Sequence, residues 1–133
     1  MLLCDSAAEV GGKLYILGGG WSVRNEPGQV LMAVAIRLVV GWNEANEPLP
    51  FALSLVDQDG HPVDAGAGPV RIEGNVEIGR PAGLPVGSDL DSALAVTLAF
   101  PLGAGRYRFE LDVAGNRLAQ ESFFVKGAPL AAR

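Results

Sequence analysis

Aspartates are the residues of this sequence whose type and spacing come closest to a metal site. They form two groups along the chain: Asp57, Asp59 and Asp64, and then Asp89 and Asp91. Carboxylate oxygens are the ligands that Ca²⁺ prefers. The first group does not form an EF-hand loop, because Gly68 occupies the position at which such a loop needs its final bidentate glutamate. A calcium site would therefore need the fold to bring both groups together.

Few residues are available for catalysis. The chain has one cysteine, Cys4, and one histidine, His61. Cys4 lies inside an apolar run, where a buried thiol is usually inert, and no sequence neighbour orients His61. The glycines at 18–20 lack the Gly-Lys-Ser/Thr ending and the following helix of a phosphate-binding loop. The sequence thus predicts no enzyme, no cofactor and no metal, and an enzyme with dispersed carboxylates stays as an alternative hypothesis.

The elements that position these residues show a two-residue alternation of apolar and polar side chains. Eight segments have this strand character, and turn or loop residues separate them: 2–8, 13–17, 30–40, 51–57, 70–78, 92–100, 106–113 and 117–125. This pattern predicts an all-β, antiparallel β-sandwich of the immunoglobulin-like or C2-like kind, with about eight strands. We expect one domain over residues 1–126 and a C-terminal tail over 127–133. One amphipathic helical turn within 79–90 is compatible with the pattern.

The first twenty-one residues predict a β-hairpin that begins the sheet. Paired glycines at 11–12 accept the positive φ angles of a tight hairpin turn. The three glycines at 18–20 then interrupt the ladder, and we expect Trp21 to pack over their bare backbone.

The direction of the strands predicts which loops meet. If every connection reverses the chain, loops 18–29, 57–69 and 101–105 gather at one end of the sandwich. Loops 41–50 and 79–90 and the turn at 114–116 gather at the other end. The two groups of aspartates then lie at opposite ends, about 20 Å or more apart. The same argument separates Trp21 from Trp42, so that we expect neither a calcium site nor a shared sugar-stacking platform.

Two surfaces are therefore the candidates for function, which we expect to be protein contact. Loops 41–50 and 79–90 are long enough to be contact loops, although the sequence leaves open whether they form one surface. Their candidate residues are Trp42, Asn43, Glu44, Glu47, Arg80, Leu84 and Asp89. The other surface is the flat row of small side chains around Ala93, Ala95 and Thr97, which would let another sheet approach, either within the domain or across a subunit boundary.

The net charge and the length of the apolar runs indicate which classes of partner this protein binds. The formal net charge is −5, with 15 acidic and 10 basic residues, whereas nucleic-acid binding normally requires a basic excess. No apolar run approaches the roughly 18 residues that span a bilayer, and no signal-peptide pattern precedes the first strand. We therefore expect a protein partner, either a second copy or a subunit of an assembly, for a cytoplasmic or virion-associated protein. A small-ligand or glycan-binding module is the alternative.

Several stretches resemble an uncharacterised family, a domain of unknown function common in actinobacteria and their phages. They are the opening LLCDSAAEVGGKLYILGGGW, the central LVDQDGHPV, the loop GRPAGLPVGSDL and the closing PLGAGRYRFELDV with its later FFV. The resemblance spans nearly the whole chain, but Val39-Val40-Gly41-Trp42 departs from it, because relatives have a proline before the tryptophan. The resemblance implies a β-sandwich in a cytoplasmic or phage-borne protein. It implies no activity and transfers no functional residues.

Overall fold

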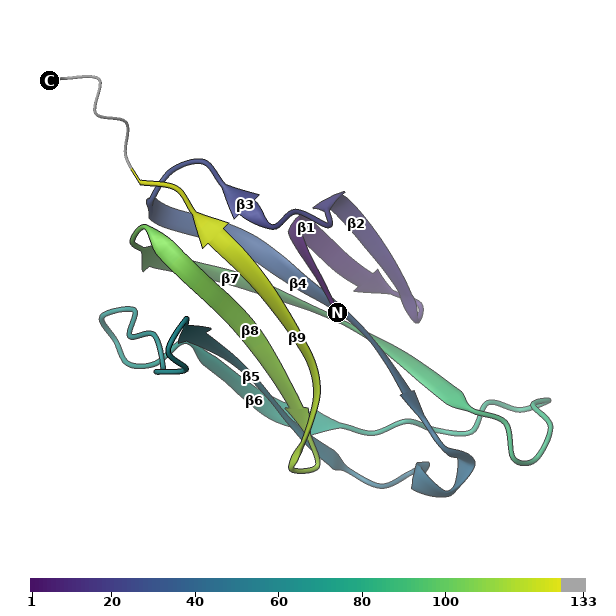
Figure 1. Ribbon diagram of the computed structural model, residues 1–133. Coiled ribbons are helices and arrows are strands. Elements are labelled where there is room, and N and C mark those ends of the chain that lie inside the picture. The colour runs from purple at the N-terminus through teal and green to yellow at the C-terminus, as the bar shows by residue number, and fades with distance from the viewer. Residues whose placement is uncertain (128–133) are drawn as a thin grey trace, which may run out of the picture.

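Two long apolar segments of the chain pair along their whole length. β4 (Gly28–Val40) and β7 (Leu90–Leu102) run antiparallel, in a register that extends from Gly28 opposite Leu102 to Val40 opposite Leu90. Because side chains alternate along a strand, the pair has one face of large apolar residues and one face of smaller residues. The computed structural model describes residues 1–127, and in it this pair forms half of a four-stranded sheet (Figure 1).

The N-terminal hairpin completes this first sheet. β1 (Leu2–Val10) and β2 (Lys13–Gly19) are joined by Gly11 and Gly12, whose φ angles are 59° and 80°. Both central residues of a type I′ hairpin turn need positive φ, which glycine adopts at little cost. The first residues of β1 pair with β4, and the strand order is β2-β1-β4-β7.

The second sheet has five strands. They are β5 (Leu49–Asp57), β6 (Arg71–Val76), β8 (Gly105–Val113), β9 (Asn116–Val125) and β3 (Val23–Arg24), in the order β3-β9-β8-β5-β6. The predicted all-β class with two sheets is confirmed. The structure adds a ninth strand to the predicted eight, and this strand, β3, pairs parallel to β9. Two residues are too few to show an alternating pattern, so the sequence did not indicate it.

The core lies between the two sheets. The large inner residues of β4, including Met32, Val34 and Ile36, pack against residues of β5, β8 and β9. Phe109 and Phe123 stack there with their ring centroids 5.9 Å apart. Among residues 1–127, no polar or charged residue is fully buried. Burial of apolar side chains between the sheets is therefore the main stabilising term.

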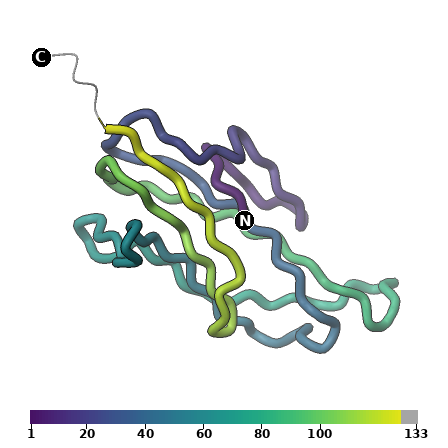
Figure 2. The backbone as a smooth tube through the Cα atoms, in the orientation of Figure 1, coloured from purple at the N-terminus to yellow at the C-terminus, as the bar shows by residue number. Residues whose placement is uncertain are grey.

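β1 bends sharply and carries the hairpin over the outside of its own sheet. Its first residues run beside β4, and the hairpin then turns back across the sheet (Figure 1, Figure 2). On this outer side Cys4, Ala33 and Ala35 form a second buried cluster, against which Ala7 and Leu14 pack. The small side chains of β4 therefore make room for a third layer.

The glycines at 18–20 serve the packing of this hairpin. A Cβ atom on Gly18 would lie 2.2 Å from a carboxylate oxygen of Asp5. We expected Trp21 to pack over this bare backbone, and this was wrong. Trp21 instead packs edge-on against Phe123, with ring centroids 5.8 Å apart. The glycines make room for a side chain of the neighbouring strand β1, which local sequence does not reveal.

The loops gather at the two ends as the strand directions predict. Residues from 18–29, 57–69 and 101–105 line one shallow hollow at one end: Pro27, Gly28, Asp64, Ala65, Gly66, Pro101, Leu102 and Gly103. At the other end, the Ala114 amide donates to the Pro50 carbonyl at 2.8 Å.

Helical structure is confined to one 3-10 turn within residues 1–127, η1 (Trp42–Glu44). The helical turn considered for 79–90 is absent, because that stretch forms non-helical turns. No helix of the described chain is long and apolar enough to cross a membrane. Of the predicted tail at 127–133, residues 128–133 lie outside the described residues.

Candidate functional site

Arg80 joins the two long loops into one surface. Its Nε and Nη2 atoms both donate to the Trp42 carbonyl oxygen, at 3.1 Å and 2.7 Å. Its guanidinium carbon also lies 4.6 Å from the centroid of the Trp42 ring. A guanidinium can do both at once, because it is planar and carries its donors in a fixed fork. The backbone amide of Asn46, in the first loop, also donates to the backbone carbonyl of Ile78 at 2.8 Å. Loops 41–50 and 79–90 are therefore one surface, a point that the sequence left open.

This surface ends in two exposed apolar side chains. Leu84 is 41% exposed and Val86 is 87% exposed. Each lies in a turn closed by backbone bonds, from the Leu84 amide to Pro81 at 3.4 Å and from the Ser88 amide to Pro85 at 3.2 Å. We name residues 81–88 the apolar turn segment. The sequence pointed to Leu84 but not to Val86, since a single valine in a Pro/Gly-rich loop carries no periodic signal.

The other predicted loop residues divide into structural and free groups. Glu44 accepts the Gly41 amide at 3.1 Å and so closes the 3-10 turn. Asn43, Glu47 and Asp89 are exposed. Trp42 is half-buried and packs against the main core. The end of the sandwich therefore has a fixed tryptophan–arginine stack with acidic and amide groups around it.

The row of small side chains on β7 is only partly a free surface. Ala93 is 9% exposed and Ala95 is half-buried, whereas Thr97 is exposed. Gly12, Lys13 and Leu14 of the hairpin line the same cleft as Ala93. The sequence left two possibilities for the sheet that approaches this row. In the structure, the domain's own hairpin approaches it.

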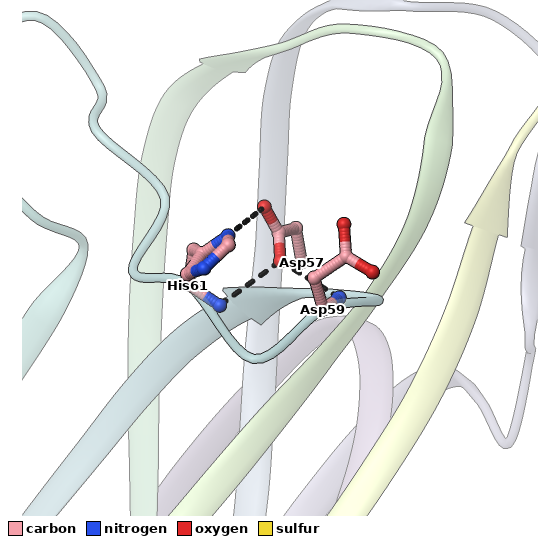
Figure 3. Close-up of side chains that lie close together, drawn as sticks. All are labelled: Asp57, Asp59 and His61. Atoms are coloured by element: carbon pink, nitrogen blue, oxygen red, sulfur yellow. Dashed lines mark hydrogen bonds and ion pairs between the residues drawn. The ribbon is translucent and has the colours of Figure 1, made fainter.

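Asp57, Asp59 and His61 are the one trio of potential metal ligands among residues 1–127. One ligand atom of each lies within 4.8 Å of the others (Figure 3). Asp57 is already engaged, because its Oδ1 accepts the amides of Asp59 and His61 at 2.9 Å and 3.0 Å. Its Oδ2 lies 3.8 Å from His61 Nδ1. These bonds hold the turn, so the trio is explained by local structure.

The remaining aspartates have separate roles. Asp64 accepts the Gly66 amide at 2.7 Å within its own turn. Asp91 pairs with Arg37 at 2.5 Å across β4 and β7. The two groups of aspartates therefore do not meet, as the strand directions predict.

Cys4 and His61 do not form a catalytic pair. Cys4 of β1 is completely buried against β4, where its thiol donates to the Ala33 carbonyl at 3.3 Å. Burial raises the pKa of the Cys4 thiol, which makes the reactive thiolate scarcer at neutral pH. His61 is exposed in the turn after β5 and pairs with Asp57.

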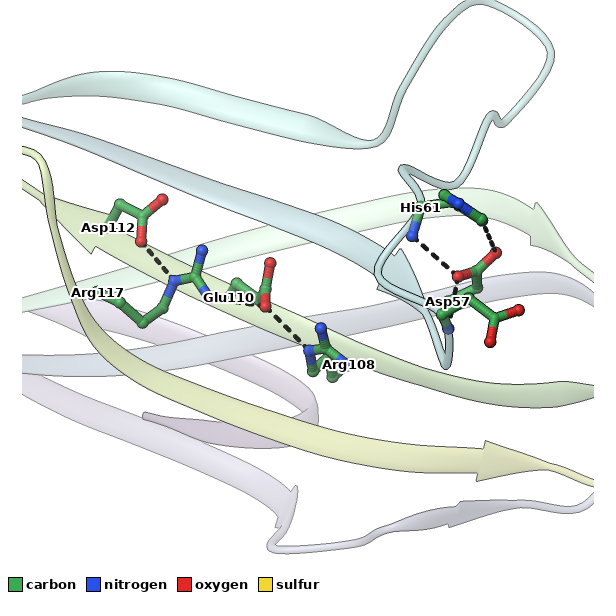
Figure 4. A network of polar contacts seen from close by, with 7 residues as sticks. Asp57, His61, Arg108, Glu110, Asp112 and Arg117 are labelled. Atoms are coloured by element: carbon green, nitrogen blue, oxygen red, sulfur yellow. Dashed lines mark hydrogen bonds and ion pairs between the residues drawn. The ribbon is translucent and has the colours of Figure 1, made fainter.

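A chain of ion pairs covers part of the outer face of the second sheet (Figure 4). Glu110, whose side chain is only 12% exposed, accepts from Arg108 at 2.9 Å and from Arg117 at 2.7 Å. Arg117 also donates to Asp112 at 2.5 Å. The predicted interaction surfaces did not include these charges. Acidic and basic residues that alternate on both sides of the turn at 114–116 were the sequence signal that they would pair.

Comparison with known proteins adds one finding. A model of a family of unknown function, DUF6941, matches residues 1–126. The chain belongs to the DUF6941 family. No curated protein and no solved structure matches it. The resemblance to an uncharacterised family is thereby confirmed, and DUF6941 membership assigns no chemistry to the residues described above.

Replacing Arg80 tests whether it fixes the loops of this DUF6941 domain. We expect Arg80→Ala to lower the free energy of unfolding by about 1–3 kcal/mol, because it removes two bonds from a charged donor and the ring stack. Arg80→Lys should recover only part of this loss, because lysine lacks the fork. Urea unfolding followed by tryptophan fluorescence measures both.

Arg106→Ala is the matched control for Arg80. Arg106 stacks on Phe124 with 5.4 Å between its guanidinium carbon and the ring centroid, and it lies at an exposed position. We expect a change below about 0.5 kcal/mol. Equal losses for Arg80→Ala and Arg106→Ala would contradict the role given to the two bonds to Trp42.

Replacing Asp57 tests the structural explanation of the aspartate–histidine trio. We expect Asp57→Ala to cost about 1–2 kcal/mol, since two amides lose their acceptor, and Asp59→Ala to cost below about 0.5 kcal/mol. In thermal unfolding, the difference in Tm between each variant and the wild-type chain should be the same with and without added Ca²⁺ or Zn²⁺. If the metal raises Tm and both variants abolish the rise, the trio is a metal site.

Proposed function

We propose that this DUF6941 chain is a non-enzymatic protein-interaction or structural β-sandwich. In this proposal it acts as a homo-oligomer or as one subunit of a larger assembly such as a virion. The observation that carries the proposal is the apolar turn segment, residues 81–88, which extends from a fixed tryptophan–arginine stack. We further propose a cytoplasmic or virion-associated location, in an actinobacterium or one of its phages.

Exposed apolar side chains in hydrogen-bonded turns support a contact role. Leu84 and Val86 are exposed, yet their turns are closed by backbone hydrogen bonds. Arg80 fixes the base of the segment against Trp42. A contact surface that is already ordered loses less conformational entropy when it binds, so more of its apolar burial appears as affinity. Loops held on a rigid sandwich are frequent carriers of recognition.

The acidic residues around the two joined loops indicate the kind of partner that they would bind. Glu44, Glu47, Glu77 and Asp89 lie exposed in or beside the two joined loops, where Arg80 is the one basic residue of 41–50 and 77–90. An acidic surround favours a protein with basic residues around an apolar pocket, because complementary charges speed association and select partners. The same charge disfavours nucleic acid.

The architecture is compatible with an immunoglobulin-like sandwich, which we propose as its finer class. Tyr107, near the start of β8, donates its hydroxyl to the Gly103 carbonyl at 2.9 Å. A tyrosine that bonds back to the chain at such a corner is typical of immunoglobulin-like domains. These domains commonly act through their end loops and strand edges rather than through a buried active site.

A small-ligand or glycan-binding module is the second candidate. A cleft of about 520 Å³ on the second sheet supports it, and its lining includes Phe51, Arg71, Glu73, Asn75 and Asp112. The charged and amide side chains of the cleft offer hydrogen-bond partners to the hydroxyl groups of such a ligand, whereas the Phe51 ring packs over Gly74 and against the core. Thermal unfolding in the presence of a ligand panel discriminates, because a ligand at a hundredfold its Kd adds about 2.7 kcal/mol.

Affinity purification tests the contact role directly. We expect the tagged chain, expressed in the cells that encode it, to retain a protein partner identified by mass spectrometry. The double variant Leu84→Ser, Val86→Ser should reduce the amount retained at least tenfold. Leu31→Ser, Val39→Ser is the matched control, because both residues are exposed on β4, and it should retain the partner. Equal retention by both variants, or nothing retained above background, would contradict the proposal.

A further inference from the structure

A hollow of about 560 Å³ lies where β3 meets the N-terminal hairpin (Figure 1). It is lined by one residue of β1 and by the segment around β3: Asp5, Trp21, Val23, Arg24, Asn25 and Glu26. β3 pairs Arg24 with Val125, which is fully buried, so the Arg24 side chain starts on the inner side of the second sheet. Trp21 packs edge-on against Phe123 of β9. The hollow therefore has a half-buried arginine and a half-buried tryptophan in its wall.

Each of these two side chains has a nitrogen that is closed to solvent and has no hydrogen-bond acceptor. They are Nε1 of Trp21 and Nε of Arg24, the only two such side-chain atoms among residues 1–127. The Arg24 guanidinium carbon lies 5.7 Å from the centroid of the Trp21 ring, so the two donors are neighbours. Buried donors are nearly always paired, because an unpaired one loses its bonds to water without a replacement. Two unpaired donors beside one hollow indicate that a ligand supplies their acceptor.

The other arginines of the described chain have their acceptors. Four of them pair with carboxylates and one bonds to a backbone carbonyl: Arg37, Arg71, Arg108 and Arg117, and then Arg80. Arg106 is exposed, so water can solvate it. Arg24 is thus the one half-buried arginine within 1–127 that has no acceptor, which makes the unpaired state a property of this hollow.

Two carboxylates restrict the ligand that fits. Asp5 and Glu26 are exposed residues of the lining, and neither is in an ion pair within the described part of the chain. The Asp5 carboxylate lies against Gly18, on the hairpin side of the hollow. Two negative charges beside one positive charge disfavour phosphate and other simple anions. They favour a molecule that carries a positive charge close to its acceptor.

We propose that this hollow binds a small zwitterion, in which a carboxylate lies a few bonds from an ammonium group. Free amino acids and a C-terminal lysine of a peptide both have this chemistry. The carboxylate accepts from Trp21 and Arg24, and the ammonium group pairs with Asp5 or Glu26. Because both donors are closed to solvent, binding turns Arg24 away from the Trp21 ring and toward the hollow, where its fork can take both carboxylate oxygens.

This inference goes beyond the proposed contact role. It rests on the second candidate function, a small-ligand module, and places the ligand outside the cleft at Phe51.

Isothermal titration calorimetry on the wild-type chain tests the ligand class. The probes are the free protein amino acids and the peptide acetyl-Gly-Lys, whose carboxylate and side-chain ammonium form the same pair of charges. We expect at least one probe to bind saturably, and the tighter of the two kinds identifies the source of the zwitterion. Acetate and methylamine should each bind at least about tenfold more weakly, because each has only one of the two charges. Acetate that binds as tightly as the best zwitterion overturns the inference, and so does a lack of saturable binding up to about 20 mM of every probe.

Two substitutions test the location. Trp21→Phe keeps a ring against Phe123 and removes the indole donor, so it should weaken the best probe at least about fivefold. Arg24→Leu should weaken it at least about tenfold. Arg106→Leu is the matched control, because it removes an exposed arginine from β8, and it should bind the probe as the wild type does. Circular dichroism checks that each variant is folded, and Trp21→Phe decides the test if Arg24→Leu is not.

Fluorescence tests the movement of Arg24. In a Trp42→Phe background Trp21 is the remaining tryptophan of the chain, and its emission should change as the probe saturates. Wild-type affinity in both Trp21→Phe and Arg24→Leu overturns the inference. If those variants bind normally and Asn75→Ala does not, the ligand occupies the cleft at Phe51. That result would support the second candidate function while excluding the hollow at Trp21.

Discussion

Burial of the middle of β4 on both of its faces is the constraint on which the rest of this structure depends. Its inner face presents large side chains such as Met32 and Ile36 to the second sheet, and its outer face presents Ala33 and Ala35 to the N-terminal hairpin. All four are at most 2% exposed. A strand covered on both sides must be apolar on both sides, which explains the uninterrupted apolar run in the middle of β4. The difference in side-chain size decides which face meets the thick core and which meets the thin third layer.

The bend of β1 follows from the same constraint and decides which surfaces stay free. To cover the small outer face, the hairpin must turn back over its own sheet, and this leaves β2 as an edge with exposed apolar side chains. The second sheet has the opposite exterior, with Glu110 held between Arg108 and Arg117. Such pairs on a surface add little stability, but they keep the face hydrated. Exposed apolar side chains therefore remain at β2 and at the apolar turn segment, and singly at other positions such as Leu31 and Val39 of β4.

The sequence predicted what depends on local alternation and turn chemistry. Residues 106–113 alternate cleanly and form β8, and Gly11 with Gly12 forms the expected turn. The bend of β1, the pairing of β3 and the stack of Arg80 on Trp42 were not predictable in this way. Each depends on a contact between segments distant in the sequence, and a single chain carries no periodic signal for such contacts. The alternating direction of successive strands did predict which loops share an end of the sandwich, because this prediction needs only the number of chain reversals.

The most direct test of the account is a comparison of two substitutions on the outer face of the first sheet. Ala33 and Thr97 lie opposite each other on β4 and β7. The hairpin covers Ala33 completely, whereas Thr97 is exposed. Urea unfolding should show that Ala33→Leu lowers the free energy of unfolding by about 1–3 kcal/mol through overpacking, while Thr97→Leu changes it by less than about 0.5 kcal/mol. If both leucines are tolerated equally, the hairpin does not cover this face and the account is wrong.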